Sequence, residues 1–99
     1  MAKVLIVTRH NATVEWLKST MLDDDQIVVT AHYTPGMAEG FDYVVGILPI
    51  QLVAELCTAG VRYYQTIMDV PEEFRGKELT IEQMDQFNAR LVQYNVEVV

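Results

Sequence analysis

The sequence predicts an α/β domain with a Rossmann-like, mostly parallel sheet of four to five strands and about three covering helices. Apolar, β-branched runs at residues 3–8 and 43–48 are continuous rather than alternating, which is typical of strands buried on both faces. Helical spacing follows each of these runs. A chain of 99 residues that is 51% apolar has room for one domain with a core. We therefore expect residues 1–99 to form a single domain.

The first third of the chain is expected to form a βαβ unit. Residues 3–8 are the first strand, and Asn11 suits the N-cap position of the helix that follows. Residues 23–25, three aspartates, end the unit as a polar turn, and residues 26–33 form the second strand. This order implies parallel strands. The apolar face of the helix is expected at Val14, Leu17 and Met21.

A second strand–helix unit follows a loop at residues 34–42. Residues 43–48 are the third strand, and Pro49 suits the first position of a helix. Gly60 suits the position just after the end of that helix. The buried face of the helix is expected at Ile50, Val53, Leu56 and Cys57, where the cysteine is inert core.

The last third is expected to add a strand and a long helix. Residues 61–68 form the fourth strand, whose alternating pattern indicates unequal faces or an edge position. After a polar connection at 69–79, residues 80–83 match a capping box for a helix that runs to about Tyr94. Residues 96–99 are a candidate terminal strand. The apolar face of the helix is expected at Ile81, Met84, Phe87 and Leu91.

Charge and composition exclude several functions. The formal net charge of −7 argues against binding to long nucleic acids or to anionic membranes. No apolar run approaches the ~18 residues of a membrane span, and we see no signal peptide, so a cytoplasmic location is expected. One cysteine allows neither a disulfide framework nor a cysteine-only metal cage. A small anionic ligand remains compatible with a few well-placed donors.

Polar residues gather where the predicted strands end. Ligands of open parallel sheets bind at the carboxyl ends of the strands, and both histidines of the chain are expected at this rim. The candidate site residues from these ends are Thr8, Arg9, His10, Asn11, His32, Gly46, Leu48, Pro49, Asp69, Arg75 and Gly76.

The start of the predicted second helix is a candidate phosphate site. Leu48 at the N-cap offers no side-chain acceptor, so the amides of Ile50 and Gln51 are left for an external anion, which the helix dipole favours. The alternative is that water or a neighbouring loop satisfies these amides.

The two arginines of the rim allow two interpretations each. Arg9 is a fork donor suited to phosphate, or it forms an ion pair with Glu15 or Asp69. Arg75 is a mobile phosphate clamp, or it forms a salt bridge with the carboxylates at 72 and 73.

The histidines also allow alternatives. His10 and His32 can each transfer protons near neutral pH or donate to an anion, or they are satisfied by local hydrogen bonds. A metal site would need His10, His32 and Asp69 to meet in space, and we expect no metal and no cofactor. GxGxxG, P-loop, GxSxG and HExxH motifs are all absent from the sequence.

The order and spacing of short motifs resemble a known family. The chain is similar to small ancillary proteins of type III CRISPR loci, the "Csx-sixteen" family, over nearly its whole length. The matching pieces are Arg9-His10, Glu15-Trp16, Ala31-His32, Asp42 to Gly46, Leu48-Pro49, Ala54-Glu55, Cys57 with Gly60, Asp69 to Leu79, Met84 and Ala89 to Leu91.

The resemblance implies a metal-independent ring nuclease with a CARF-like domain. Such proteins cleave cyclic oligoadenylate, most often cyclic tetra-adenylate, and switch off the antiviral signal. The ring binds across a homodimer, and a ribose 2′-hydroxyl attacks the neighbouring phosphate to leave a 2′,3′-cyclic phosphate. On this view His10 transfers protons, in a direction left open, and Arg9 and Arg75 hold phosphate. The alternatives are a module that binds the ring without cutting it and a domain for another nucleotide-type ligand.

Overall fold

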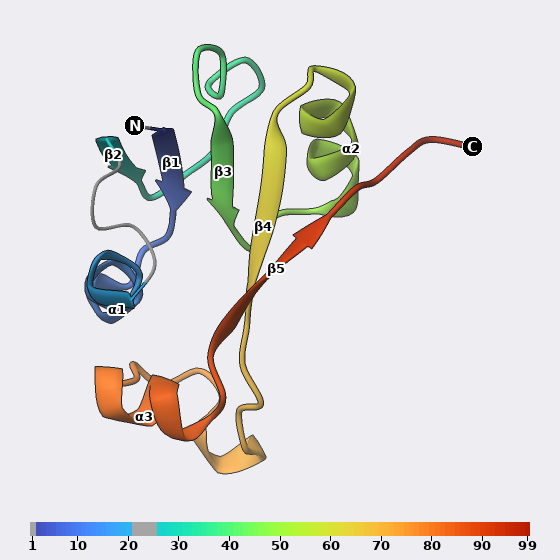
Figure 1. Ribbon diagram of the computed structural model, residues 1–99. Helices are drawn as coiled ribbons and strands as arrows, with labels where there is room; N and C mark the ends of the chain where they lie inside the picture. The colour runs from blue at the N-terminus through green and yellow to red at the C-terminus, as the bar shows by residue number, and fades with distance from the viewer. Residues whose placement is uncertain (1, 21–25) are drawn as a thin grey trace.

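A five-stranded sheet forms the centre of the computed structural model, which describes residues 2–20 and 26–99 (Figure 1). The strand order is β2-β1-β3-β4-β5, and β5 alone runs antiparallel to its neighbour. The predicted α/β fold with a mostly parallel sheet is therefore confirmed. The strands are β1 (Lys3–Val7), β2 (Gln26–Thr30), β3 (Tyr43–Gly46), β4 (Arg62–Ile67) and β5 (Arg90–Tyr94).

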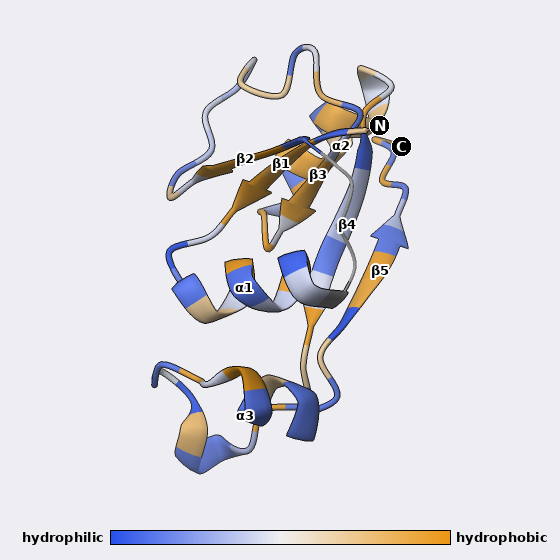
Figure 2. Cartoon of the chain, turned by 60° about the vertical axis from the view of Figure 1, so that its left-hand side comes forward, coloured by the Kyte–Doolittle hydropathy of each residue, from blue (hydrophilic) through white to orange (hydrophobic). Residues whose placement is uncertain are grey.

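Helices cover both faces of this sheet. Alternate residues of β1 divide between two cores: Val4 and Ile6 pack with Trp16 and Leu17 of α1, whereas Leu5 packs on the face of α2. This division follows from the two-residue period of a strand. It explains why β1 after Lys3, and β3, are apolar on both faces (Figure 2). The helices are α1 (Asn11–Thr20), α2 (Ile50–Thr58), the 3₁₀ turn η1 (Glu72–Phe74) and α3 (Ile81–Gln86).

The start of α1 differs slightly from the prediction. Asn11 is the first residue of the helix rather than its N-cap, and the carbonyl of His10 accepts the bond from the amide of Val14 at 3.4 Å. Leu17 is buried as expected, whereas Met21 and the aspartate turn lie outside the described residues.

The ends of α2 confirm one expectation and correct another. Pro49 is the N-cap, with an extended ψ of 146°, and no side chain caps the helix. The predicted helix start at Pro49, with Leu48 as N-cap, is therefore wrong by one residue. Gly60 adopts φ +81°, and the amides of Gly60 and Val61 donate to the carbonyls of Cys57 and Leu56. This Schellman motif confirms Gly60 as the position after the helix end.

The strands differ from the prediction in extent and order. β4 lies between β3 and β5, so its interpretation as an edge strand is wrong. The second strand ends at Thr30 rather than at residue 33, and the third ends at Gly46 rather than at residue 48. The shorter strands place His32 and Leu48 in the loops beyond the sheet, where they are free to line a site.

The last third of the chain departs most from the prediction. The capping box of Thr80 and Gln83 is present, but α3 ends at Gln86 because Asn88 adopts the left-handed φ of +59°. The chain then returns as β5, in which Leu91 pairs with Thr66. The predicted helix to Tyr94 is therefore wrong, and in this described segment residues 96–99 form no strand.

Among the described helices, none combines the length and the apolar character needed to cross a membrane. What the fold does provide is a sheet edge at which the parallel strands β1 to β4 all end. The segment from η1 to α3 connects β4 to β5 and lies below this edge (Figure 1).

Candidate functional site

A cavity of about 670 Å³ opens at the carboxyl ends of the parallel strands. Its walls come from the loops after β1, β2 and β3, from the end of β4, and from the segment that leads into α3. The volume lies within the range of small-molecule sites. The residues that give the cavity its polar character are Thr8, Arg9, His10, Thr13, His32, Tyr33, Thr66 and Lys77.

The inner part of the cavity is apolar. Leu17 from α1, Val45 from β3 and Met84 from α3 are buried and line it. Thr66 on β4 also lines this part, is only 5% exposed, and its hydroxyl has no hydrogen-bond partner within the described chain. An apolar chamber with one unused hydroxyl suits a flat, partly polar ring, whereas the cations Arg9 and Lys77 suit an anion.

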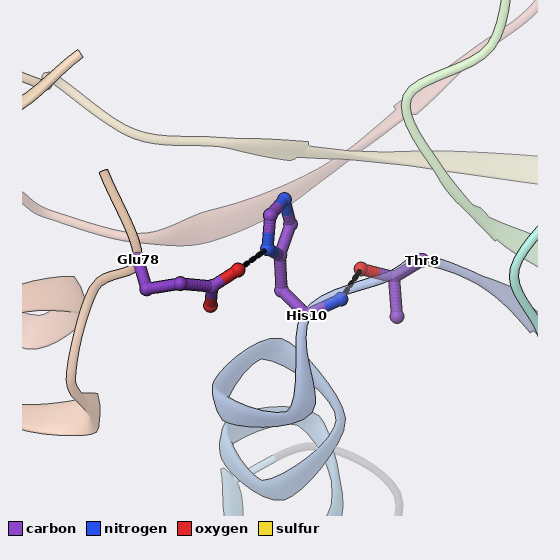
Figure 3. Close-up of polar contacts among 3 residues, drawn as sticks. All are labelled: Thr8, His10 and Glu78. Atoms are coloured by element: carbon purple, nitrogen blue, oxygen red, sulfur yellow. Dashed lines mark hydrogen bonds and ion pairs between the residues drawn. The ribbon is translucent and has the colours of Figure 1, made fainter. Parts of the chain in front are cut away.

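His10 is held by a carboxylate from a distant part of the chain. Its Nδ1 lies 2.6 Å from Oε1 of Glu78, and its backbone amide donates to the Thr8 hydroxyl at 3.1 Å. Figure 3 shows that the second ring nitrogen of His10 points away from Glu78. Both side chains are more than half exposed, at 57% and 71%, so a ligand in the cavity can reach the imidazole.

Arg9 contacts the other histidine. Its Nη2 lies 3.3 Å from Nδ1 of His32, so Arg9 reaches an imidazole instead of the carboxylates of Glu15 or Asp69. Asp69 lies 3.6 Å from Arg90. The expected ion pair of Arg9 with either carboxylate is therefore wrong. A guanidinium has five N–H donors, which leaves Arg9 with donors for a second partner.

The loop after β3 is fixed by a buried tyrosine. The hydroxyl of Tyr63 donates to the carbonyl of Gly46 at 3.1 Å and accepts from the amide of Leu48 at 3.0 Å. Burial raises the pKa of Tyr63 above the ordinary tyrosine value, against the lowering effect of the Leu48 hydrogen bond. This contact sets the course of Gly46 to Pro49, which forms one wall of the cavity.

A comparison with known protein families gives a match, and it covers nearly the whole chain. Residues 5–97 match the family described as "Putative CRISPR-associated protein (Cas_VVA1548)". The chain belongs to this family. Comparisons with curated proteins and with solved structures gave no match.

In this CRISPR-associated chain the cavity brings together part of the predicted site. Seven of the predicted residues line it: Thr8, Arg9, His10, His32, Gly46, Leu48 and Pro49. Six others lie outside its lining: Asn11, Ile50, Gln51, Asp69, Arg75 and Gly76.

The residues outside the lining have identifiable surroundings. Ile50 and Gln51 lie in the first turn of α2, and Ile50 is 70% exposed. Arg75 follows η1, where its amide donates to the carbonyl of Glu72. Asp69 turns toward β5 through Arg90.

Sequence reasoning missed Lys77 and Glu78 as site residues of the CRISPR-associated chain. They lie in the polar connection after β4, which carries neither periodicity nor a motif that marks a site. Glu78 is 68 residues from His10 along the chain, so only the tertiary structure shows the pair. The resemblance of residues 69–79 to the family motif is the one sequence signal that covered this segment.

The metal alternative has no support in the site. Across residues 2–20 and 26–99, no group of three His, Cys, Asp or Glu side chains is placed to hold a metal ion. Asp69, the third residue of the alternative, is occupied by Arg90 at 3.6 Å.

Proposed function

We propose that this CRISPR-associated protein is a ring nuclease that cleaves cyclic oligoadenylate, with cyclic tetra-adenylate as the preferred ring. The observation that carries the proposal is the composition of one cavity, in which two histidines and the cations Arg9 and Lys77 surround an apolar interior. A nucleotide needs this combination, because its phosphate is anionic while its base is flat and mostly apolar. The family membership supports a role in a CRISPR system, and the class of nucleotide is taken from the resemblance of the sequence motifs.

The proposed reaction needs no metal or cofactor. A ribose 2′-hydroxyl of the ring attacks the neighbouring phosphate, so the nucleophile is part of the substrate. The protein then contributes alignment and stabilisation of charge. Arg9 has N–H donors beyond the one that faces His32, and Lys77 lines the same cavity; these two observations support phosphate binding by both residues in the proposal.

Two parts of the expected site change in this proposal. Arg75 lies outside the cavity lining and Lys77, two residues further on, lies within it, so the role of phosphate clamp passes to Lys77. The amides at the start of α2 also lie outside the lining and hold no phosphate of the ring in the proposal.

The proposed active form is a homodimer. A ring with two-fold symmetry can use the same cavity twice across a two-fold axis. Ile47 at the cavity wall and Ile50 beside it are 68% and 70% exposed, and large exposed apolar side chains at one rim favour association. A monomeric mass at micromolar concentration, with and without the ring, would count against a shared ring.

The test of the proposed function is direct. The protein is incubated with cyclic tri-, tetra- and hexa-adenylate in EDTA, and the products are separated and analysed for a 2′,3′-cyclic phosphate end. Linear products from cyclic tetra-adenylate are expected. Binding without any product would support the alternative of a ring-sequestering module, and neither binding nor cleavage would favour another nucleotide-type ligand.

A variant of Arg9 tests the cavity as the place of binding. Arg9→Ala removes charge-assisted hydrogen bonds worth roughly 1.5–3 kcal/mol, which corresponds to about a tenfold to hundredfold loss of binding or turnover. Arg62→Ala is the matched control, because Arg62 lies at the opposite end of β4, where it contacts the ring of Tyr43. Full activity of a folded Arg9→Ala protein would contradict the assignment.

A further inference from the structure

The two histidines of the cavity are each contacted at Nδ1, but one partner is a hydrogen-bond acceptor and the other is a donor. Nδ1 of His10 faces a carboxylate oxygen of Glu78, whereas Nδ1 of His32 faces a guanidinium nitrogen of Arg9. Both imidazoles line the same cavity, and they are the two histidines of the chain.

The partners decide where each imidazole carries its proton. An ionised carboxylate only accepts hydrogen bonds, so His10 donates from Nδ1, and in the neutral ring Nε2 is then an acceptor. A guanidinium only donates, so Nδ1 of His32 accepts, and the proton of His32 is on Nε2. A neutral His10 is therefore an acceptor toward a ligand, and His32 is a donor.

We propose that this opposition assigns separate roles to the two histidines, an inference that rests on the proposed function. Nε2 of His10 is the base that takes the proton of the attacking 2′-hydroxyl. Nε2–H of His32 donates a hydrogen bond to a phosphoryl oxygen and transfers no proton. Glu78 and Arg9 are positioning residues that set these two states.

The step balances with these assignments. The 2′-oxygen forms a bond to phosphorus as its proton passes to Nε2 of His10, and the bond from phosphorus to O5′ breaks. O5′ takes a proton from water at the open mouth of the cavity, and His10 later returns its proton to water. The products are a 2′,3′-cyclic phosphate and a 5′-hydroxyl. The charged groups near His10 that line the cavity are Arg9 and Lys77. Glu78 contacts the imidazole of His10 at Nδ1.

Nitrogen NMR tests the proton positions without any substrate. Long-range ¹H–¹⁵N spectra at mildly alkaline pH distinguish the two neutral forms of histidine, and the His32→Gln protein identifies the signal of His10. We expect the proton on Nδ1 of His10 and on Nε2 of His32. Glu78→Ala should shift the His10 proton toward Nε2, whereas Glu73→Ala, in the same exposed segment, should not. A wild-type His10 with its proton on Nε2 would overturn the inference.

Kinetics test the consequence for catalysis. Glu78→Ala should lower kcat on cyclic tetra-adenylate at least about tenfold, since a positioned base contributes ~10²–10⁴-fold, while the Kd for the ring changes little. Glu78→Gln keeps an acceptor oxygen and should recover part of the rate. His32→Gln should lower kcat, because the phosphoryl oxygen loses a hydrogen bond in the transition state. A cyclic substrate with sulfur in place of O5′ has a better leaving group and would restore the rate of a variant that lacks its general acid. It should not restore the rate of His32→Gln selectively, because in this proposal His32 is not an acid.

The outcomes separate the inference from the proposed function. If the wild-type protein cuts the ring and Glu78→Ala cuts it with the same kcat, the role of Glu78 is refuted and the ring nuclease activity stands. Selective rescue of His32→Gln by the sulfur-containing ring would show that His32 is an acid and would refute its assignment as a neutral donor. If the wild type cuts no ring, the proposed function fails and the catalytic roles fail with it.

Discussion

Removal of one hydroxyl group from the core should loosen the wall of the cavity. Tyr63 is fully buried, and its hydroxyl joins the carbonyl of Gly46 and the amide of Leu48 at 3.1 and 3.0 Å. Tyr63→Phe keeps the ring and its packing but removes these two hydrogen bonds to the backbone, together with the longer contact of 3.3 Å to Oε1 of Gln65. The backbone between Gly46 and Leu48 then loses the contact that sets its course past the cavity.

The size of the effect follows from these two bonds. A hydrogen bond contributes about 0.5–1.5 kcal/mol to stability, so the free energy of unfolding should fall by roughly 1–3 kcal/mol. For a domain of this size, 1 kcal/mol lowers Tm by about 4–8 °C, and we expect a loss of at least ~4 °C. The assay is thermal unfolding followed by circular dichroism, supported by urea unfolding with an unchanged m-value.

Tyr64→Phe is the matched control for this prediction. Tyr64 is the next residue of β4, and its ring lies edge-on to Tyr43, with centroids 5.2 Å apart. In the described chain its hydroxyl has no hydrogen bond, so its removal should change Tm by much less. An unchanged Tm in Tyr63→Phe, or an equal loss in both variants, would refute the reasoning.

Three further predictions concern the buried interior on the two faces of the sheet. Burial raises the pKa of Tyr63 above 10.0, so the unfolded chain loses the phenol proton at a lower pH than the folded chain. The contribution of the buried phenol to stability is therefore present below about pH 10 and is lost as the pH rises. In alkaline unfolding titrations Tyr63→Phe should lose less stability than the wild type, and parallel curves for the two proteins would contradict this prediction. Gly46→Ala places a Cβ 3.0 Å from the carbonyl oxygen of Val7 and should cost about 1–3 kcal/mol, which an unchanged urea midpoint would exclude. Asp85→Ala removes the acceptor at 3.1 Å from the indole of Trp16; it should lower the free energy of unfolding by about 1 kcal/mol and change the fluorescence of this single tryptophan. Asp85→Asn keeps an acceptor oxygen and should retain most of the stability and of the wild-type fluorescence. Identical spectra of the wild type and the two variants would show that the contact has no such effect.

Local signals predicted the parts of the fold that local chemistry controls. The apolar run at β1 identified a strand buried on both faces because each face has its own helix. The capping box at Thr80 and the glycine after α2 were identified because their hydrogen bonds join residues a few positions apart.

The end of α3 was beyond such signals. Leu91 continues the helical spacing of the preceding apolar residues, and yet it lies in β5 opposite Thr66. The decisive event is the left-handed turn at Asn88, which lets the chain pair with the open side of β4. A strand that forms by long-range pairing is not distinguishable by periodicity from the last turn of a helix.

The candidate site was predictable where strands deliver residues and not where a loop returns. Arg9, His10 and His32 were placed together because they follow parallel strands, whose ends share one edge. Lys77 and Glu78 reach this edge through the course of the segment before α3, which depends on the packing of Met84 and Leu79 against the sheet.

The excursion between β4 and β5 also makes the site a late product of synthesis. A chain emerges from the ribosome with its N-terminal part first, so the strands that carry Arg9, His10 and His32 are complete while Glu78 is still to be added. A nascent or truncated product that stops before η1 holds both imidazoles but lacks the carboxylate that orients His10. Such a product presents an incomplete cavity, and two fragments divided between β4 and η1 would have to associate before His10 meets its partner.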